Sequence, residues 1–570
     1  MKSLIKERKI VLFFVSLYLL NLLYLLSTFY SIYGVNDDHL INTMLNGSYE
    51  STDKHKVTYI HEILGYIVVL LYRIFPIFPI FSLLLLIFFV TAIIGVYVLA
   101  VKINRLNLLM LSISWLISSI FITNWFVLNP TFTAISILLS SFGYFFIFII
   151  LKSGSRIKPL SFLLPIIILI FGYMLRSKGF QSSSLVWIPA IITVLLFKTV
   201  NNKAKASSKF DPKYLFLIFP ILIIVISNLF ISQDWKNYYA YNNLRQEIAN
   251  TTRTIYIQQN IEKSNWDQDE LILFDNYLFA DQEVFNKSQL EFLIELSTSS
   301  QGVQGLLNPV VSVEDRLLNL KRYIGLILTF LILPIGLMIV NSRKNYSNYT
   351  FFGIILGSTF FALYFILATG KIEERVIIPV ILNIWFITFA LPSKSIESFK
   401  FFRIFVSLVI FSLFLFNFQN HIHEPTYFKE RSKWNKRAIV FAKEQQNFLE
   451  SVGSDSIFIG PTSSIRSSWT SPYGPITKKG LNFVSLGWHN FSPSWISHNK
   501  RIFKNELTVY ENLLSNPKAY WISDPDSSEY FFNYLRKNYS DKINPSIVVS
   551  FGDASNDYGG IYNVYSLFIK

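Results

Sequence analysis

Long apolar blocks constrain this chain more than any other feature of its sequence. They run for about 17 to 24 residues, the length needed to cross the roughly 30 Å hydrocarbon layer of a bilayer. Hydrophobic residues make up 52% of the 570 residues, and the mean hydropathy is +0.40. A soluble chain of this length would normally be polar enough to cover roughly two to four domains. The blocks therefore predict a polytopic α-helical membrane protein.

Eleven transmembrane spans can be placed on these blocks. With the N-terminus inside the cell, they leave the C-terminus outside, and every short inner segment is basic, as the positive-inside rule requires. The same bias accounts for the net charge of +15 without a nucleic-acid partner. The region 63–101 has two possible interpretations. It contains either one interfacial helix followed by one span, or two short spans. The spans lie at about 10–32, 79–101, 106–128, 131–151, 159–175, 183–199, 214–232, 323–341, 350–369, 376–392 and 401–418.

The spans predict a transmembrane domain over residues 1–418, with outer segments at 34–78 and 234–322. Residues 63–75 are amphipathic, which predicts a helix lying along the membrane interface. Residues 419–570 alternate helical patterns with strand-like runs, which predicts a small extracytoplasmic α/β domain. Helices are expected there at 434–452, 503–515 and 528–538, and strands at 456–459, 519–522 and 547–550. The chain contains no cysteine, which excludes a disulfide framework, a thiolate nucleophile and a Cys-ligated zinc.

Asp37 and Asp38 stand side by side a few residues after the first apolar block. Burying either carboxylate unpaired would cost several kcal/mol, so packing does not account for the pair. Either one can accept a proton from an acceptor hydroxyl. With His39, the pair also offers ligands for a divalent cation such as Mg²⁺ or Mn²⁺. The structural alternative is that Asn36 or Asp37 caps a helix over residues 38–46.

Three histidines, His39, His55 and His61, fall in the same outer segment. A zinc site on a helix needs a tighter spacing, such as two histidines about four residues apart on one face. The observed spacing therefore favours hydrogen bonding to a substrate, a role assigned here to His39 and His61. Ordinary surface placement is the alternative.

Four basic residues are expected at the outer ends of spans, where the positive-inside rule disfavours them. Arg176 and Lys178 follow the fifth span, and Lys371 and Arg375 flank the hairpin between the ninth and tenth. Arginine can bind a phosphate through two parallel hydrogen bonds, so these residues are predicted to bind a donor phosphate. The alternatives are snorkelling to lipid head groups and, in the hairpin, pairing with neighbouring glutamates.

Aromatic residues interleaved with amides and acids fill the long outer segment, at 238–248, 266–271 and 275–281. Rings stack on the apolar face of a sugar while polar side chains bond its hydroxyl groups. Asn243 and Arg245 are assigned to substrate on this basis. Aromatic belts at membrane interfaces produce the same composition.

A stretch of the last domain, residues 487–495, resembles a loop with two exposed tryptophans, Trp488 and Trp495. Contact with carbohydrate and docking onto the membrane domain are both open for this loop. Trp488 is included among the substrate-binding candidates.

The plan of the chain resembles that of the GT-C glycosyltransferases, which are integral membrane enzymes, over roughly residues 1–420. The shared features are an acidic outer loop after the first span, an interfacial helix, and a large outer segment after the seventh span. More narrowly, the chain is similar to a group of uncharacterised bacterial GT-C-like proteins. The stretches that carry this resemblance are 36–49, 64–73, 243–245, 370–376 and 487–493.

The resemblance implies a polyprenyl-phosphate-linked sugar as donor and an acceptor outside the cytoplasmic membrane. The catalytic acid of the family lies in the first outer loop, which maps to Asp37 or Asp38. The paired-acid motif that some metal-using members carry in a later loop has no clear match, so metal dependence is open.

The leading hypothesis is a multi-pass glycosyltransferase of the cytoplasmic membrane that transfers sugar to a cell-surface glycan or glycolipid, with inversion. Asp37 is the expected base and Asp38 its orienting partner, whereas the leaving phosphate needs no general acid. One rival is a transporter or flippase for a lipid-linked or polyanionic glycan, and another is an assembly protein without chemistry. Transporters often show mid-span charges and inverted repeats, and neither is evident here.

Overall fold

The computed structural model describes most of the chain, with gaps between several helices. The spans predicted at 323–341 and 401–418 lie outside the described residues, as do Lys371 and nearly all of the span predicted at 214–232. The described residues are 2–33, 36–47, 55–103, 108–152, 159–203, 222, 231–249, 261–299, 346–368, 374–390, 426–453, 455–462, 464, 471–474, 482–551 and 561–569.

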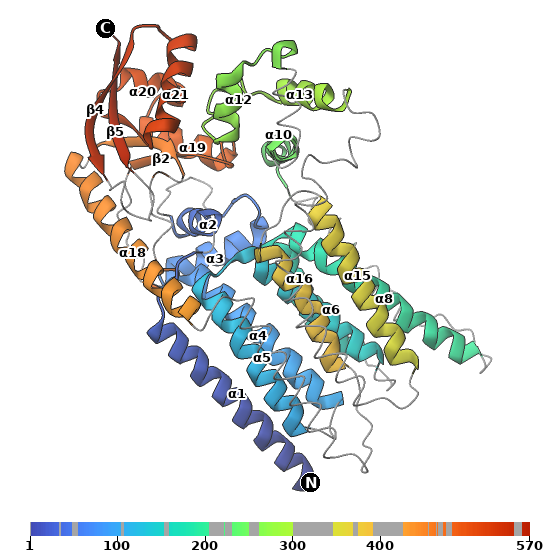
Figure 1. Cartoon of the computed structure of the whole chain (residues 1–570). Helices are drawn as coiled ribbons and strands as arrows, with labels where there is room; N and C mark the ends of the chain where they lie inside the picture. The colour runs from blue at the N-terminus through green and yellow to red at the C-terminus, as the bar shows by residue number, and fades with distance from the viewer. Residues whose placement is uncertain are drawn as a thin grey trace.

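A bundle of apolar helices forms one half of the molecule (Figure 1). Among the described residues, five helices contain a stretch long and apolar enough to cross a membrane: α1 (Lys2–Thr28), α4 (Ile80–Ile103), α5 (Leu108–Leu128), α6 (Phe132–Lys152) and α8 (Ser177–Lys203). Shorter apolar stretches lie in α7 (Leu163–Leu175), which follows the 3₁₀ turn η1 (Pro159–Phe162), and in α15 (Tyr346–Ala368) and α16 (Glu374–Ala390). The prediction of a helical membrane protein is confirmed, whereas the count of eleven spans and their orientation stay predictions.

Helix α6 is buried along nearly its whole length and packs against α4, α7, α8 and α16. Glycines on the neighbouring helices allow close approach. A Cβ added at Gly172 would lie 2.2 Å from Ser140 Oγ, and one at Gly179 would lie 2.6 Å from Ser136 Oγ. Ser136 Oγ also donates to the Gly172 carbonyl at 2.7 Å. Small residues and hydroxyl–carbonyl bonds are how helices associate inside a membrane, where apolar burial gives no driving force.

Two short helices, α2 (Asn36–Asn46) and α3 (Glu62–Ile74), lie across one end of the bundle (Figure 1). Helix α3 has 13 residues, too few to cross a bilayer, and corresponds to the interfacial helix predicted at 63–75. One face packs into the protein through Leu64, Val68 and Tyr72. The opposite face exposes apolar side chains at helical spacing: Ile63, Tyr66, Ile67, Leu70 and Ile74. An exposed apolar face of this kind is typical of a helix that lies along a membrane surface.

The C-terminal part is an α/β domain whose five described strands form one mixed sheet in the order β2-β1-β3-β5-β4. β1 pairs in parallel with β2 and β3, whereas β5 runs antiparallel to β3 and β4. The small α/β unit predicted from the sequence is therefore present. Its strands are β1 (Ile457–Pro461), β2 (Asn482–Leu486), β3 (Ala519–Ser523), β4 (Ile543–Phe551) and β5 (Tyr562–Ile569), and its helices are α18 (Thr426–Val452), α19 (Pro493–Phe503), α20 (Val509–Ser515) and α21 (Pro525–Asn538).

The single helix predicted at 503–515 is wrong, because two helices meet there. Lys504 has a left-handed backbone, with φ of 58°, and this ends α19. Thr508 and Glu511 then form a capping box that starts α20.

The described part of the outer segment packs with the C-terminal domain. It contains α10 (Gln233–Ala249), η3 (Ile261–Lys263), α12 (Gln268–Asp275) and α13 (Lys287–Ser299). Its aromatic and aliphatic side chains share one hydrophobic core with the sheet domain. Tyr510 lies at the centre of this contact, since its hydroxyl donates to the Leu278 carbonyl and accepts from the Ala280 amide. The two parts therefore form one globular unit above the bundle.

Helix α18 joins this globular unit to the bundle (Figure 1). The amide of Tyr30, just after α1, donates to Ser432 Oγ at 2.8 Å. Asn435 Nδ2 donates to the Tyr30 carbonyl at 2.8 Å and to the carbonyl of Leu128, the last residue of α5, at 3.3 Å. These bonds satisfy backbone groups at helix ends and fix α18 to two spans.

Candidate functional site

The two neighbouring aspartates of α2 have different surroundings. Asp38 is fully buried, and its Oδ1 accepts a hydrogen bond of 2.7 Å from the amide of Phe132, the first residue of α6. A carboxylate at this position satisfies one of the amides that a helix start leaves unpaired. Asp38 Oδ2 makes no hydrogen bond to any described residue. Asp38 therefore joins α2 to the central helix of the bundle.

Burial raises the pKa of Asp38 to about 8. The Phe132 amide and the guanidinium groups of Arg375 and Arg176 act in the opposite direction, and the charge of Asp37 adds to the increase. At neutral pH, Asp38 therefore carries a proton. A carboxylic acid in this state is a poor general base, and this distinguishes it from its neighbour.

Asp37 reaches the rim of the site. Its side chain is 20% exposed, and its Oδ2 lies 3.9 Å from Nη1 of Arg375, which is 15% exposed. Arg375 is in the first turn of α16 and comes from a part of the chain more than three hundred residues away. The fold thus brings together a predicted base and a predicted phosphate-binding arginine. Their separation of 3.9 Å is at the long end of the range for an ion pair.

Arg176 lies at the end of α7, where its backbone caps the helix. Its Nη1 donates to Thr133 Oγ1 at 2.5 Å. The guanidinium carbon is 4.9 Å from the ring centre of Tyr59 and 5.1 Å from that of Phe132. Stacking against two rings holds the guanidinium plane in one orientation. Arg176 therefore presents a fixed positive charge beside the start of α6.

Tyr59 connects the bundle to the globular unit. Its backbone has φ of 76°, a strained value for a residue with a side chain. Its ring stacks against Phe132 and lies 4.8 Å from the ring centre of Trp488. Trp488 is half-buried and packs against the core of the bundle. Docking is therefore observed for this loop tryptophan, since it spans the contact between the two halves of the molecule.

Trp495, expected to be exposed, is instead buried within the globular unit. It is 4% exposed, and its Nε1 donates to the Ser485 carbonyl at 2.9 Å. It lies on α19, whose N-cap Ser492 accepts a hydrogen bond from its amide. The sequence pattern of an exposed aromatic loop was misleading here because one turn of helix directs this ring into the core.

The outer helix α10 supplies a second arginine. Arg245 is 3% exposed, and its Nε and Nη2 both donate to Asn242 Oδ1, at 3.0 and 2.9 Å. Its neighbour Asn243 is exposed, so the buried amide beside Arg245 is Asn242. Lys178 is exposed, and its Nζ donates to Gln246 Oε1 at 2.8 Å. Lys178 therefore links α8 to α10.

The two candidate histidines have local partners. His39 is half-buried with its ring edge-on to Tyr33, and burial lowers its pKa to about 4. His61 caps α3, its Nδ1 accepting from the Ile63 amide at 3.3 Å. Within the described ranges, no group of three or more His, Asp or Glu side chains is arranged to hold a metal ion. The donor set around Asp37 and Asp38 does not fit Mg²⁺ or Mn²⁺, because the adjacent charges are arginines.

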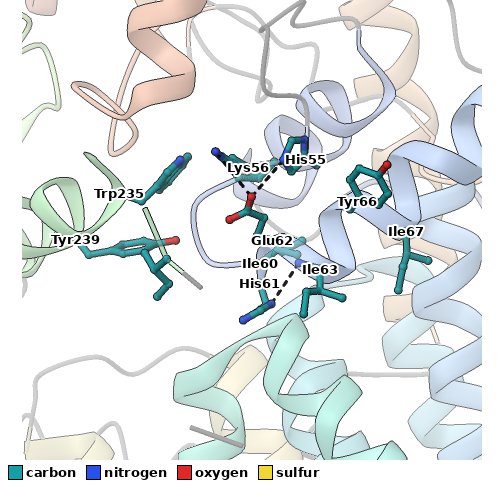
Figure 2. A pocket seen from close by; sticks show the side chains of 12 residues that line it. His55, Lys56, Ile60, His61, Glu62, Ile63, Tyr66, Ile67, Trp235 and Tyr239 are labelled. Atoms are coloured by element: carbon teal, nitrogen blue, oxygen red, sulfur yellow. Dashed lines mark hydrogen bonds and ion pairs between the residues drawn. The ribbon is translucent and has the colours of Figure 1, made fainter. Parts of the chain in front are cut away.

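A cavity of about 460 Å³ lies between α3 and α10 (Figure 2). Its polar side is formed by Lys56, His55 and Glu62, with Glu62 Oε1 3.8 Å from Lys56 Nζ and 3.3 Å from His55 Nε2. Figure 2 shows Trp235 and Tyr239 of α10 facing these residues from across the cavity. The remaining lining is Val57, Ile60, His61, Ile63, Tyr66, Ile67 and Ile231. Much of the apolar wall belongs to α3, whose exposed face continues outward from it.

Several residues of the site were not anticipated from the sequence. Tyr59, Phe132 and Thr133 carry no motif, and their position beside Arg176 depends on the packing of α6 against α7. Lys56 and Trp235 meet across the cavity although they are far apart in the chain. The one sequence signal that pointed to the site and the cavity was the placement of basic and aromatic residues near the ends of predicted spans.

Comparison of the chain with family models, with curated proteins and with solved structures finds no match.

Proposed function

We propose that this protein is a membrane glycosyltransferase that transfers a sugar from a polyprenyl-phosphate donor to a glycan or glycolipid acceptor on the extracytoplasmic face of the cytoplasmic membrane. The observation that carries the proposal is the position of Asp37. It is a partly exposed carboxylate facing the guanidinium of Arg375, at the end of an apolar bundle and close to the interfacial helix α3.

Asp37 is the general base in this proposal. It accepts the proton of the acceptor hydroxyl as the acceptor oxygen bonds to the anomeric carbon of the sugar. The bond from that carbon to the phosphate oxygen breaks at the same time, and polyprenyl phosphate leaves with the electron pair. In-line attack inverts the anomeric configuration. A positioned base contributes about 10²- to 10⁴-fold to such a step.

Asp38 is a positioning residue. Its protonated, buried side chain holds α2 against the start of α6, and this fixes the direction in which Asp37 points. The one-residue spacing explains why two adjacent carboxyl groups serve different purposes, since neighbouring positions on a helix face different surroundings.

Arg375 and Arg176 are the proposed stabilisers of the leaving phosphate. Arg176 is held over two rings, and both guanidinium groups act electrostatically on Asp38, so both lie near the same point. Fixed positive charge at the place where negative charge develops is usually the largest single contribution to such a transfer. Lys371 and Lys178 remain proposed as further contacts to the donor phosphate. The residues that remain proposed as substrate contacts are Arg245, Asn243, His39, His61 and Trp488.

The cavity beside α3 is the proposed site for the lipid part of the donor nearest its phosphate. Its wall continues into the exposed apolar face of α3, which in this proposal faces the membrane surface. Lys56 supplies a positive charge, and the Nε1 of Trp235, 4% exposed, makes no hydrogen bond to a described residue. A donor group without an acceptor suits an anionic head group.

The test is transfer of radiolabelled sugar from polyprenyl phosphate by the full-length protein in liposomes. Asp37→Asn should reduce transfer about 10²- to 10⁴-fold while leaving the melting temperature unchanged. Asp526→Asn, an exposed aspartate at the start of α21, serves as the matched control. Full activity of Asp37→Asn would exclude the base assignment. Flipping of the lipid-linked sugar without transfer to any acceptor would favour a transporter.

A further inference from the structure

The first half of α18 carries a basic surface that the proposed function does not use. Residues 429–437 contain five cations, and Glu430 is their one acid. Four of the cations recur at intervals of three and four residues, so they lie on one face of the helix, and all four are exposed. We refer to this surface as the α18 basic face, and its residues are Lys429, Lys433, Lys436 and Arg437.

Hydrogen bonds place this part of α18 where two membrane helices end. The apolar stretch of α1 ends at Thr28, and that of α5 ends at Leu128. Asn435 Nδ2 donates to the carbonyls of Tyr30 and Leu128. The Ile32 amide donates to the same Leu128 carbonyl at 3.3 Å, so the two helices end side by side. A bilayer that covers both helices has its head groups at this level.

Lys436 lies beside the surface of α1 that the protein leaves uncovered. Its Nζ is 5.3 Å from the ring centre of Tyr30, which is 44% exposed. Tyr24, near the end of α1, is also exposed. A tyrosine and a lysine together at the end of a lipid-facing helix are typical of a membrane interface. The exposed apolar residues earlier in α1 are Leu12, Phe13, Leu17, Leu20 and Leu23.

The lysines of the α18 basic face are available to a ligand. None of the three forms an ion pair with a residue that the structure describes. Arg431 differs from them, because its Nη2 donates to Asn129 Oδ1 at 3.2 Å. Its guanidinium carbon also lies 4.6 Å from the ring centre of Trp434. Arg431 therefore fixes the helix to the end of α5, while the lysines point outward.

The position and charge of this face favour anionic lipid head groups as its ligand. Clustered lysines beside the end of a membrane helix attract anionic lipids, and each one strengthens binding about fivefold. The orientation predicted from the sequence puts this end of the bundle outside the cell, where the positive-inside rule disfavours cations. Topology therefore does not account for the face. A soluble polyanion would match the charge, but only a lipid also matches the exposed tyrosines and the helix ends.

We infer that the α18 basic face binds the phosphate groups of anionic lipids in the leaflet next to the ends of α1 and α5. Helix α18 continues from there to the sheet (Figure 1), where Gln445 Nε2 donates to the Ser464 carbonyl at 2.9 Å. Lipid bound to its first half therefore helps to hold the globular unit over the bundle. This inference does not depend on the proposed function.

The experiment measures binding of fluorescently labelled phosphatidylglycerol and phosphatidylcholine to the full-length protein in a neutral detergent. The wild-type protein should bind phosphatidylglycerol about tenfold more tightly, and the difference should shrink as salt rises from about 0.1 to 1 M. The double variant Lys433→Gln/Lys436→Gln should weaken binding of phosphatidylglycerol about 25-fold and leave phosphatidylcholine unchanged. Both lysines are exposed, so its melting temperature in detergent alone should equal that of the wild-type protein.

The matched control is Lys443→Gln, an exposed lysine of the same helix. It lies about 15 Å along α18 from Lys433, beyond the Debye length of about 8 Å at physiological salt, and should bind phosphatidylglycerol normally. Asp37→Asn should also bind it normally.

Equal binding of the two lipids, or a preference that the double variant leaves unchanged, would overturn the inference. An equal loss in Lys443→Gln would do the same, because net charge rather than position would then explain the binding. Inorganic polyphosphate tests the soluble alternative. If it displaces phosphatidylglycerol and loses affinity for the double variant to the same extent, the face binds a soluble polyanion and the lipid assignment is wrong.

Discussion

Helix α10 forms one wall of two cavities, and the two cavities differ in what they offer a ligand. Trp235 and Tyr239 line the cavity beside α3, whereas Asp234, Tyr238 and Tyr241 line a second cavity. The first cavity continues into an apolar surface that a bilayer would cover. The second, between α10 and α19, lies within the globular unit and combines aromatic and apolar side chains with charged and polar ones.

This difference teaches that α10, whose two faces have similar hydropathy, separates two chemical environments rather than a core from solvent. Its residues are aromatic on both faces, so hydropathy alone does not distinguish them. The character of each cavity depends on the helix that faces α10. Apolar α3 lies on one side, and the basic, polar face of α19 lies on the other. The comparison is sharpened by variants that affect one cavity, both, or neither.

The largest expected effect is that of Gly65→Ala, which acts on the cavity beside α3 alone. A Cβ there would lie 2.0 Å from the carbonyl oxygen of His55, so the backbone of the cavity wall must move. We expect a loss of about 3 kcal/mol in stability and weaker use of the lipid donor. Thermal unfolding and donor titration measure both effects. Gly353→Ala, where a Cβ meets nothing within 4 Å, is the control.

Trp488→Ala should affect both cavities, because Trp488 contacts Tyr59 and accepts from Tyr238 through its backbone. Removing the half-buried ring should cost about 2 kcal/mol of packing. The globular unit should then become more susceptible to limited proteolysis near residues 487–495. Trp488→Phe should restore most of the protection. Unchanged proteolysis of Trp488→Ala would contradict the idea that this ring couples them.

The charge state of Asp38 should give stability a pH dependence. The folded protein holds this proton up to about pH 8, whereas the unfolded chain releases it near pH 3.8. Between these values the free energy of unfolding therefore falls as pH rises, by up to about 1.4 kcal/mol per pH unit. Melting temperatures of the wild-type protein and of Asp38→Asn from pH 5 to 8 measure the effect. The variant, which keeps an oxygen acceptor for the Phe132 amide, should show a flatter profile.

The smallest effect is expected for Lys178→Ala. Its contact with Gln246 is exposed, and such contacts contribute less than about 1 kcal/mol. Transfer activity should fall less than threefold, because the ammonium group is engaged by Gln246 of α10. A decrease of a hundredfold would instead make Lys178 a main contact to the donor phosphate. Gln246→Ala should reproduce the small effect.

Much of the bundle could be predicted from sequence because long apolar blocks have few stable arrangements in a bilayer. The existence of a short helix near 63–75 and three of the strands in the last domain also followed from local pattern. Strands β2 and β5 were missed, since β2 depends on pairing with β1 and β5 on pairing with β3 and β4. Local pattern contains no information about such distant pairing.

The candidate site was predictable only as a list of residues. Asp37, Arg176 and Arg375 follow from charge at unfavourable positions, yet the difference between Asp37 and Asp38 depends on the Phe132 amide. The same holds for Asn242, which bonds Arg245 while Asn243 faces outward. Moving one position along a helix changes the surroundings of a side chain completely. Sequence patterns do not define well which of two neighbouring residues points into the protein.

The tight packing of α6 has a consequence for how such a protein can diversify. Glycine contacts leave its neighbours no room to slide, and Asp38 fixes its first residue to α2. The floor of the candidate site therefore tolerates little substitution. Helices α3, α10 and α19 are free of that constraint at their cavity-lining positions. Substitutions that change ligand preference among descendants of this chain should therefore accumulate on those three helices, while α6 and the residues packed against it stay the same.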